Sequence, residues 1–519
     1  MTAMEPREKA VVIGAGMGGL ASAIRLAALG FSVTVVESAE APGGKARAIP
    51  SVAGPVDTGP TVLTMRHVFD DLFALGGQRL DDHVTLVPQP ILARHWWTGS
   101  QPLDLFPERD ANIEAIRNFS GARDAAAFAR FDALSEALFQ AFDVPVMQSA
   151  KPDLARIART TLRQPRLWPA LLPGMTLTRL LRSQFRDPRL VQLFARYATY
   201  VGGRPAHSPG VLSLIWRAEG AGVWAVKGGM HSLAAALARL AEGMGVRFLY
   251  ANRAKRILRQ GGHVTGVEVE GSTLPARICV FNGDPAALHQ GLLGDAAVDA
   301  IPSRATAPRS LSAWVWAFAA RPHGADLVHH NVFFSDNPSA EFGPIGRGEM
   351  PEKPTLYICA EDRATAPPTD APERFEIILN APAGVQPFPK EEAQCRTRTF
   401  HRLKDFGLTF SPDPGIEALT TPSTLARLFP GSQGAIYGRS PEGMMAAFQR
   451  PGARTALPGL YLAGGGAHPG AGVPMAALSG KHAAEAIRQD LISASTSAPT
   501  VMPGGISTGS ATTGRAHFR

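Results

Sequence analysis

Cysteine is scarce in this sequence. The 519 residues include only three cysteines, Cys279, Cys359 and Cys395, and no two of them stand in a C-x-x-C spacing. A small, odd number of unclustered cysteines argues against a disulfide framework and provides no zinc motif. We therefore expect a protein of the reducing cytoplasm that has no metal site.

An unbroken apolar run long enough to span a membrane is also lacking. Two uncharged windows, 10–24 and 455–480, come nearest. The first resembles a signal peptide but carries glycines in a nucleotide-binding pattern. The second holds seven glycines and three prolines, too many for a continuous spanning helix. The sequence argues against an integral membrane protein and leaves a peripheral one open.

Acidic residues are few in the segment 151–189, where nine lysines and arginines accompany two aspartates. Leucines and Trp168 are interleaved with these basic residues. The formal charge of +8 suits either nucleic acid or an anionic membrane surface. The interleaved apolar residues favour helices that lie on a bilayer, with basic side chains at the lipid phosphates. A pair of solvated basic helices is the alternative. We expect an anionic membrane surface as a partner, and no nucleic acid.

Glycine, by contrast, is abundant and patterned. Gly14, Gly16 and Gly19 form G-x-G-x-x-G between an apolar strand and a helix, and a second strand ends at Glu37. The first glycine permits a tight turn, the second lets a pyrophosphate approach the backbone, and the third lets helix and strand pack closely. The helix N-terminus attracts phosphate, and the carboxylate suits a ribose diol. This register predicts a dinucleotide site.

A glycine-rich extension follows the second strand. The segments APGGKARAI and VDTGPTVL supply Gly44, Lys45, Arg47, Gly59 and Pro60. A simple NAD site has no need of such an extension, although two ordinary turns would also account for it. FAD enzymes of the glutathione-reductase and amine-oxidase type use a similar extension to cover the phosphates and the ribityl chain.

A third glycine-rich stretch, AGGGAHPGAGVP (463–474), lies between a predicted buried strand and a helix expected from Met475. Glycines let the main chain lie directly against a ligand, and prolines fix the turns between them. A flexible surface loop is the alternative. The flanking strand and helix favour a large ligand packed against this backbone.

Taken together, these segments resemble a known family. AVVIGAGMGGLASAIRLAALG, E-x4-PGGK-x-R, DTGPTVLT, GVWAVKGGMHSLAAAL, FNGDP, GSQGAIYG and GLYLAGGGAHPGAGVPMAALSGK are similar to segments of bacterial phytoene-desaturase-type carotenoid desaturases. The resemblance implies FAD, bound by Gly14, Gly16, Gly19, Glu37, Gly44, Lys45, Arg47, Gly59, Pro60, Gly465, Gly472, Val473 and Pro474. Many relatives have arginine at the position of Lys45. A lysine is a point charge, which loosens phosphate contact there or passes it to Arg47.

The resemblance also implies a fold and a domain organisation. We expect an α/β architecture with a Rossmann-like FAD-binding domain in three pieces, 1–76, 224–300 and 455–490. Residues 77–223 are predicted to form a helical substrate- and membrane-contacting region. Strand patterns within 309–382 predict a second sheet in an inserted α+β substrate domain, 301–454. The Ser/Thr/Gly/Pro-rich tail, 491–519, is expected to be disordered.

Three segments, LARHWW, YATYVGGRPAHSPGVLSLIW and EGAGVWAVKGGM, are more similar to desaturases of 1-hydroxy or 1-methoxy acyclic carotenoids than to phytoene desaturases. The resemblance implies 3,4-desaturation of 1-hydroxyneurosporene or methoxyneurosporene in spheroidene-type biosynthesis, at the inner photosynthetic membrane. A hydrocarbon polyene requires an apolar tunnel that opens near the bilayer. Candidates for its wall are Trp96, Trp97, Trp216, Trp314, Trp316 and the apolar β segment around Phe333.

The expected chemistry is hydride transfer from an allylic carbon to the flavin with loss of a neighbouring proton. His468 is the candidate catalytic residue, which either accepts that proton or positions the flavin. Arg204, His207 and Glu219 are candidates to face a polar substrate end. Because no second dinucleotide motif is present, oxygen or a membrane quinone is the expected electron acceptor.

Three alternatives remain open on the sequence. A phytoene desaturase or carotenoid isomerase would share the same motifs. An amine oxidase would act on soluble cationic substrates, which the basic charge balance disfavours. A flavin-free lipid escort protein of the same fold is disfavoured by the intact glycine motifs and Glu37. The oligomeric state is not predicted.

Overall fold

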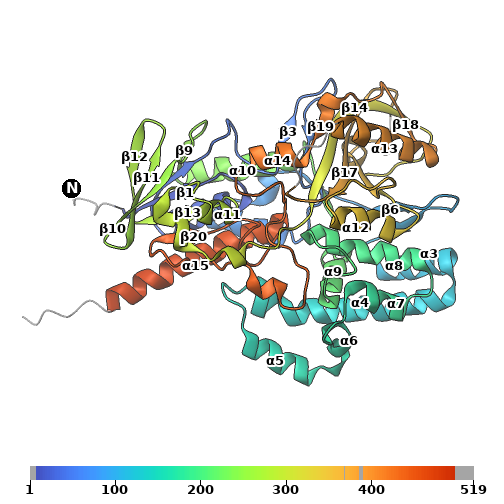
Figure 1. The fold of residues 1–519 in the computed structure, drawn as a ribbon, viewed down its shortest axis with the longest axis horizontal. Helices are drawn as coiled ribbons and strands as arrows, with labels where there is room; N and C mark the ends of the chain where they lie inside the picture. The colour runs from blue at the N-terminus through green and yellow to red at the C-terminus, as the bar shows by residue number, and fades with distance from the viewer. Residues whose placement is uncertain (1–6, 368, 385–389, 497–519) are drawn as a thin grey trace, which may run out of the picture.

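The computed structural model describes residues 7–367, 369–384 and 390–496. A five-stranded parallel sheet in the order β20-β13-β1-β2-β9 lies at one end of the molecule (Figure 1). Its strands are β1 (Lys9–Ile13), β2 (Ser32–Val36), β9 (Arg247–Leu249), β13 (Ile278–Phe281) and β20 (Leu460–Leu462). These strands come from all three pieces predicted to form the FAD-binding domain. The boundaries of that domain remain a prediction.

The helices α1 (Met17–Ala28) and α15 (Val473–Thr496) pack on this sheet, and α15 and α10 (Met230–Gly243) both pack against α1. The contact between α1 and α15 is close, because a Cβ on Gly480 would lie 2.6 Å from the carbonyl oxygen of Gly18. The helix that follows the first glycine motif and the helix that follows the last one therefore lie side by side in one hydrophobic core. A smaller antiparallel sheet, β10 (Arg256–Gln260), β11 (His263–Val269) and β12 (Ser272–Pro275), adjoins it, and Gly261 and Gly262 form the turn between β10 and β11.

A second, larger mixed sheet has the order β18-β14-β17-β16-β15-β6-β7, with β19 beside β14. The segment 309–382, whose strand patterns predicted this sheet, supplies β14 (Ser312–His323), β15 (His330–Phe333), β16 (Leu356–Ala360) and β17 (Glu373–Ala381). Two further strands come from the region predicted to be helical: β6 (Ala93–Trp96) and β7 (Leu103–Leu105). β6 joins because it pairs in parallel with β15. The strands β18 (Thr409–Ser411) and β19 (Leu419–Thr420) complete the sheet. The same part of the chain also forms the helices α12 (Pro338–Gly346) and α13 (Glu391–Asp405).

A helical lobe projects beside the second sheet (Figure 1). Its helices are α3 (Arg109–Ser120), α4 (Ala122–Phe142), α5 (Leu154–Arg163), α6 (Trp168–Leu171), α7 (Leu177–Gln184), α8 (Pro188–Ala195), the short helix η4 (Arg196–Val201) and α9 (Leu214–Gly220). α5 lies at the edge of the lobe and has no buried residue. Most of the residues from Arg109 to Gly220 are therefore helical, while the role of the region 77–223 in substrate and membrane contact stays a prediction.

One predicted boundary was wrong. The tail was expected to be disordered from 491, but α15 continues to Thr496, because Ile487 and the residues before it pack in the core and the helix extends beyond them. Residues 497–519 lie outside the described part of the chain.

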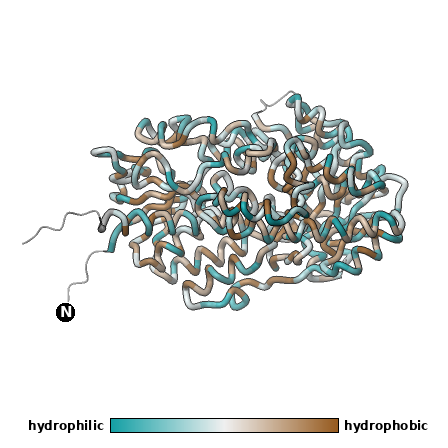
Figure 2. The backbone as a smooth tube through the Cα atoms, turned by 90° about the horizontal axis from the view of Figure 1, so that it is seen from below, coloured by the Kyte–Doolittle hydropathy of each residue, from teal (hydrophilic) through white to brown (hydrophobic). Residues whose placement is uncertain are grey.

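Apolar and polar residues alternate along the helices (Figure 2). Among the helices of the described residues, none has the length and apolar composition needed to cross a membrane.

Candidate flavin and substrate site

A cavity of about 2050 Å³ connects the glycine-rich turns to the helical lobe. Twelve of the thirteen predicted cofactor residues line it, namely Gly14, Gly16, Glu37, Gly44, Lys45, Arg47, Gly59, Pro60, Gly465, Gly472, Val473 and Pro474. Three distant segments therefore meet at one cavity, as a shared ligand would require. The thirteenth residue, Gly19, is not in the wall. A Cβ there would lie 2.0 Å from the carbonyl oxygen of Gly14, so Gly19 allows the close approach of strand and helix.

The first turn has the geometry of a phosphate-binding loop. Gly14 has a φ of +99°, which favours glycine, and its N–H donates to the carbonyl of Val36 over 2.8 Å. The following residues open α1, whose N-terminus faces the cavity. Glu37 is buried, and its two carboxylate oxygens accept N–H groups of Ala15 at 2.7 Å and Ala39 at 2.8 Å. The acid is thereby fixed at the edge of the nucleotide turn.

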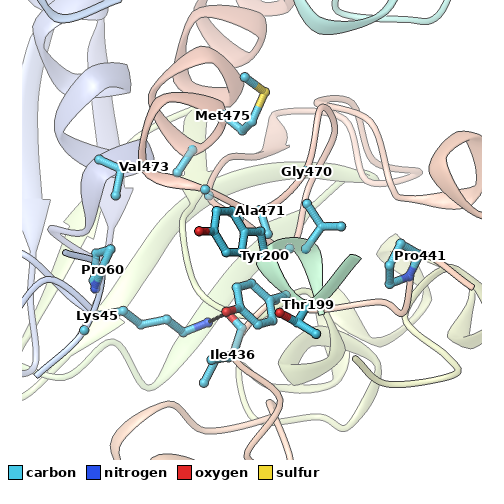
Figure 3. Close-up of a pocket in the computed structure, with 18 of the residues that line it drawn as sticks. Lys45, Pro60, Thr199, Tyr200, Ile436, Pro441, Gly470, Ala471, Val473 and Met475 are labelled. Carbon is cyan, nitrogen blue, oxygen red and sulfur yellow. Dashed lines mark hydrogen bonds between the residues drawn. The ribbon is translucent and has the colours of Figure 1, made fainter. Parts of the chain in front are cut away.

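The second segment places two cations in the wall. Lys45 Nζ donates to the carbonyl of Ile436 over 2.6 Å (Figure 3), and burial lowers the pKa of this ammonium to about 8. Arg47 Nη2 donates to Thr420 Oγ1 over 3.0 Å. Lys45 is thus held by a backbone carbonyl on the far side of the cavity, while both cations remain within the lining.

The terminal segment closes the cavity with a helix N-terminus. Gly472 has a φ of +112° immediately before α15, and a Cβ on it would meet nothing closer than 3.8 Å. Open space therefore lies in front of the positive end of this long helix, which stabilises a nearby negative charge. Gly464 N–H donates to Ser479 Oγ over 2.7 Å, which ties the turn to the helix.

His468 lies beside this cavity but is not part of its lining. Its Nε2 contacts the carbonyl oxygens of Val146 at 2.9 Å and Ser149 at 3.0 Å, so Nε2 carries the proton and donates to them. Burial lowers the pKa of the ring, which keeps it neutral. This geometry favours a positional role for His468 over that of a proton acceptor, because the ring holds the helical lobe against the terminal loop.

Two residues of the wall were not predicted from the sequence. Arg450 is buried, and its Nη1 donates to the carbonyls of Tyr437 and Gly465, each over 2.9 Å. Asn282 Nδ2 donates to the carbonyl of Gly14 over 3.2 Å. The motif FNGDP, noted as part of the resemblance, contains Asn282. Arg450 does not belong to a recognisable motif, because its role depends on contacts with the carbonyls of two loops that the sequence does not predict.

The tryptophans proposed for the tunnel wall lie elsewhere. Trp97 and Trp216 pack in the core of the helical lobe, and Trp314 and Trp316 pack in the core of the second sheet. None of the five tryptophans lines the cavity. Large aromatic rings complete these cores because they bury much apolar area. The apolar cavity wall consists instead of aliphatic side chains and phenylalanines, among them Val332 and Phe334 on either side of Phe333.

Of the residues proposed for a polar substrate end, only Glu219 lines the cavity. Arg204 instead forms a bidentate pair with Glu442, with Nε to Oε1 and Nη2 to Oε2 both at 2.8 Å. His207 is exposed and outside the lining.

The sequence predicts no metal site. In the described residues one group, His329, His330 and Cys359, places its potential ligand atoms within 4.8 Å of one another. Their hydrogen bonds run to protein: His329 Nδ1 contacts the Ala360 carbonyl at 2.9 Å, and His330 Nδ1 contacts Tyr357 Oη at 2.7 Å. Burial raises the pKa of the Cys359 thiol, which favours the neutral form.

The donor set around the cavity fits FAD. Two helix N-termini, a fixed carboxylate and two cations meet at one end, and glycine turns let the backbone approach the ligand. The rest of the wall is largely apolar and extends to α5 of the helical lobe, where Ile157 and Leu162 contribute. A dinucleotide and a long apolar molecule can therefore share this cavity.

Several known proteins are similar to this chain over nearly its whole length. A hydroxyneurosporene desaturase of Cereibacter sphaeroides is 64% identical over 488 residues, which cover 94% of this chain and 99% of that protein. One of Rhodobacter capsulatus is 63% identical over 95% of this chain and 100% of that protein. A 1-hydroxycarotenoid 3,4-desaturase of a Flavobacterium species is 29% identical over 92% and 99% of the two chains.

Solved structures show the same fold at low sequence identity. Cyclohexylamine oxidase of Brevibacterium oxydans superposes with a TM-score of 0.54 at 16% identity, over 94% of this chain and 100% of the other. A fatty acid isomerase of P. acnes gives a TM-score of 0.57 at 12% identity, over 94% and 99%. The family model of flavin-containing amine oxidoreductases matches residues 17–488. The chain therefore belongs to the flavin-containing amine oxidoreductase family.

Proposed function

We propose that this protein is an FAD-dependent carotenoid desaturase that introduces the 3,4 double bond into acyclic 1-hydroxy or 1-methoxy carotenoids of spheroidene-type biosynthesis. The observation that carries the proposal is the single cavity that joins the nucleotide turns to an apolar space. A soluble cationic amine would gain little from such a space, whereas a polyene must be kept from water along its length. The desaturases described above, 64% and 63% identical, support the same substrate class.

FAD, when bound, supplies the hydride acceptor. The protein holds it through the helix N-termini, Glu37 and the cations of the wall, and orients the polyene against it by shape. A bound polyene is shielded from water because most of the surface of this cavity is apolar. No charged side chain is required to initiate the reaction, since a conjugated polyene stabilises developing positive charge by itself.

Substrate entry is proposed at α5. Ile157 and Leu162 of this helix line the cavity, yet Leu162 is 72% exposed and nearby Trp168 is 46% exposed. Exposed apolar side chains beside arginines are typical of a surface that rests on anionic lipid. We propose that this face docks on the inner photosynthetic membrane, from which the carotenoid enters, and that oxygen or a membrane quinone accepts the electrons.

The activity is tested with FAD-loaded protein and liposomes that contain either phytoene or 1-hydroxyneurosporene, with products separated by chromatography. A product of longer absorption wavelength from the hydroxylated substrate alone is expected. Conversion of phytoene would make the protein a phytoene desaturase. Isomerised substrate with unchanged mass would identify a carotenoid isomerase, and no product from either carotenoid with flavin bound would refute the proposal.

Membrane docking is tested by co-sedimentation with anionic and zwitterionic vesicles. The wild type is expected to sediment with anionic vesicles, and the double variant Leu162→Gln, Trp168→Gln is expected to bind them less. Val52→Gln is the matched control, because Val52 is also apolar and 89% exposed but lies outside the lobe. Equal binding by the double variant and the control would contradict the docking surface.

A further inference from the structure

A buried charge pair lies in the largely apolar lobe wall of the cavity. Arg196 and Glu219 both line it, and their side chains are only 9% and 4% exposed. Arg196 Nη2 donates to Glu219 Oε1 over 3.2 Å, and Tyr197 Oη donates to the same oxygen over 2.9 Å. The guanidinium carbon also lies 5.1 Å from the ring centre of Tyr200. Arg182 and Arg186 line the cavity too, but both are exposed.

The pair is costly for a site that binds only hydrocarbon. Burial of two charges carries a desolvation penalty that is offset only by good geometry and further hydrogen bonds. The contact here is a single long hydrogen bond, and Arg196 Nε is buried without a hydrogen-bond partner among the described residues. A buried, unpaired N–H of a charged group is a strong donor that lacks an acceptor. The pair is therefore short of hydrogen bonds, and a ligand oxygen atom beside the parts of Arg196 and Glu219 that line the cavity would add one.

The pair lies close to the cofactor end of the cavity. The helix η4, which begins with Arg196, is followed by Gly202, and a Cβ on Gly202 would lie 2.6 Å from Cδ2 of Tyr437. Tyr437 follows Ile436, whose carbonyl holds Lys45. It precedes Gly438, on which a Cβ would lie 2.9 Å from the Cα of Gly466.

A second set of contacts reaches another cofactor segment. Tyr357 Oη lies 2.6 Å from the hydroxyl of Thr61, which directly follows the predicted cofactor residues Gly59 and Pro60. Tyr357 also packs in the same hydrophobic core as Tyr197 and Tyr200, which contact Glu219 and Arg196. Figure 3 draws Tyr200 in the same part of the wall as Lys45, Pro60 and Ala471.

This position matches the chemistry of the proposed substrate. In a 1-hydroxy carotenoid the oxygen is on C1, and the bond that is desaturated joins C3 and C4. The oxygen is therefore only a few bonds from the reacting carbons. A protein group that binds this oxygen must lie beside the flavin, and a polar residue at the far end of the cavity could not reach it.

Resting on the proposed function, we propose that Arg196 and Glu219 form the binding site for the C1 oxygen and thereby determine specificity. The Arg196 guanidinium donates to that oxygen, which is an acceptor in both a hydroxyl and a methyl ether. Glu219 accepts the hydrogen of a hydroxyl, which an ether lacks. The pair therefore holds the oxygenated end of the polyene next to the cofactor. A pure hydrocarbon end forms no hydrogen bond with it and binds less tightly.

The test compares kcat/KM for 1-hydroxyneurosporene with that for neurosporene, which lacks the oxygen. The double variant Arg196→Met, Glu219→Gln removes the pair as a unit, so that neither charge is left buried alone. The matched control is Arg363→Met, Glu373→Gln, since this pair is similarly buried, at 10% and 5% exposure, and does not line the cavity. Flavin content and melting temperature are recorded for each variant, and substrate Kd is measured from the carotenoid absorption shift on binding.

The ratio of the two kcat/KM values is expected to fall by roughly 10- to 150-fold in the double variant, the range for a hydrogen bond to a charged group. Kd for the hydroxylated substrate should weaken while Kd for neurosporene does not, and the control should keep the wild-type ratio. An unchanged ratio in a flavin-loaded double variant would overturn the inference. So would an equal fall in the control.

If the double variant fails to fold, the single change Glu219→Gln decides the matter. It is expected to lower kcat/KM for the hydroxylated substrate relative to the methoxy substrate by roughly tenfold. An unchanged ratio would again refute the assignment. The failure of the proposed function is separate and visible in the wild type: a wild-type protein that converts no 1-oxygenated carotenoid overturns both, whereas one that does so with unaffected variants overturns the inference alone.

Discussion

The close approach of β1 and α1 can be tested by adding one methyl group. In Gly19→Ala the new Cβ would lie 2.0 Å from the carbonyl oxygen of Gly14 and 2.9 Å from Asn282 Nδ2. The first contact involves backbone, which cannot rotate away as a side chain can. The helix must therefore shift away from the strand, and overpacking of this kind costs about 1–3 kcal/mol, occasionally more. The shift also displaces the phosphate-facing N-terminus of α1, so flavin binding is expected to weaken together with stability.

Gly243→Ala in α10 is the matched control. It is also a helical glycine, but a Cβ there would meet nothing within 4 Å. Because alanine restricts the unfolded chain more than glycine does, this change is expected to be neutral or to stabilise by up to about 1 kcal/mol. Urea unfolding and the flavin-to-protein absorbance ratio measure both effects. Wild-type stability and flavin content in Gly19→Ala would refute the packing argument, as would equal destabilisation by the control.

Three further predictions concern buried charges. Burial lowers the pKa of Lys45 to about 8, so FAD affinity in a fluorescence titration is expected to weaken by up to about tenfold per pH unit above pH 8; Lys45→Met should remove this dependence. Burial raises the pKa of Glu361 to about 8, and the negative charge of Asp57 adds to this effect. Because this pKa lies above the unfolded value, the group stabilises the fold fully below about pH 4.5, and that stability is lost as the pH rises towards 8. Glu361→Gln should therefore raise the unfolding free energy by about 1–3 kcal/mol at pH 8 and leave it unchanged at pH 4, and equal effects at both values would contradict the assignment. Arg450→Met removes bonds to two loop carbonyls and should cost about 2–5 kcal/mol with loss of flavin, whereas Arg454→Met, at an exposed pair, should cost less than about 1 kcal/mol; similar losses would be evidence against the loop contact.

Local patterns in the sequence were sufficient for most of the fold. The strand–turn–helix around Gly14 and the four long strands of the second sheet have apolar patterns of their own, so they could be predicted without knowing their partners. β6 and β7 could not. Each is three or four residues long, and β6 is a strand because β15, far away in the chain, offers it a parallel edge. Pairing of this kind leaves no periodic signal in a short segment.

The residues of the site also divide into those that the sequence predicts and those that only tertiary packing brings there. The predicted cofactor residues occur in glycine-rich turns, whose backbone requirements are visible as composition, and they meet at the cavity. Arg196 is one arginine among many in the lobe, and its burial follows from how η4 packs. His468 was identified because of the loop that holds it, but composition does not specify which way a ring points. Its Nε2 contacts carbonyls of the segment after α4, a contact set by tertiary packing alone.

The placement of Arg196 and Glu219 has a consequence for how substrate length is specified. If the only buried charges of the lobe wall lay at the far end of the cavity, the protein would measure the distance from that end to the flavin and would accept one chain length. They lie beside the cofactor segments instead, and most of the remaining wall offers apolar contact, which is non-directional and roughly proportional to area. Discrimination at the oxygenated end is then strong, because an unpaired buried donor is costly. A missing methylene in the tail costs only about 1–3 kcal/mol. The cavity should thus be strict about the end that reacts and tolerant of the length and saturation of the rest of the polyene.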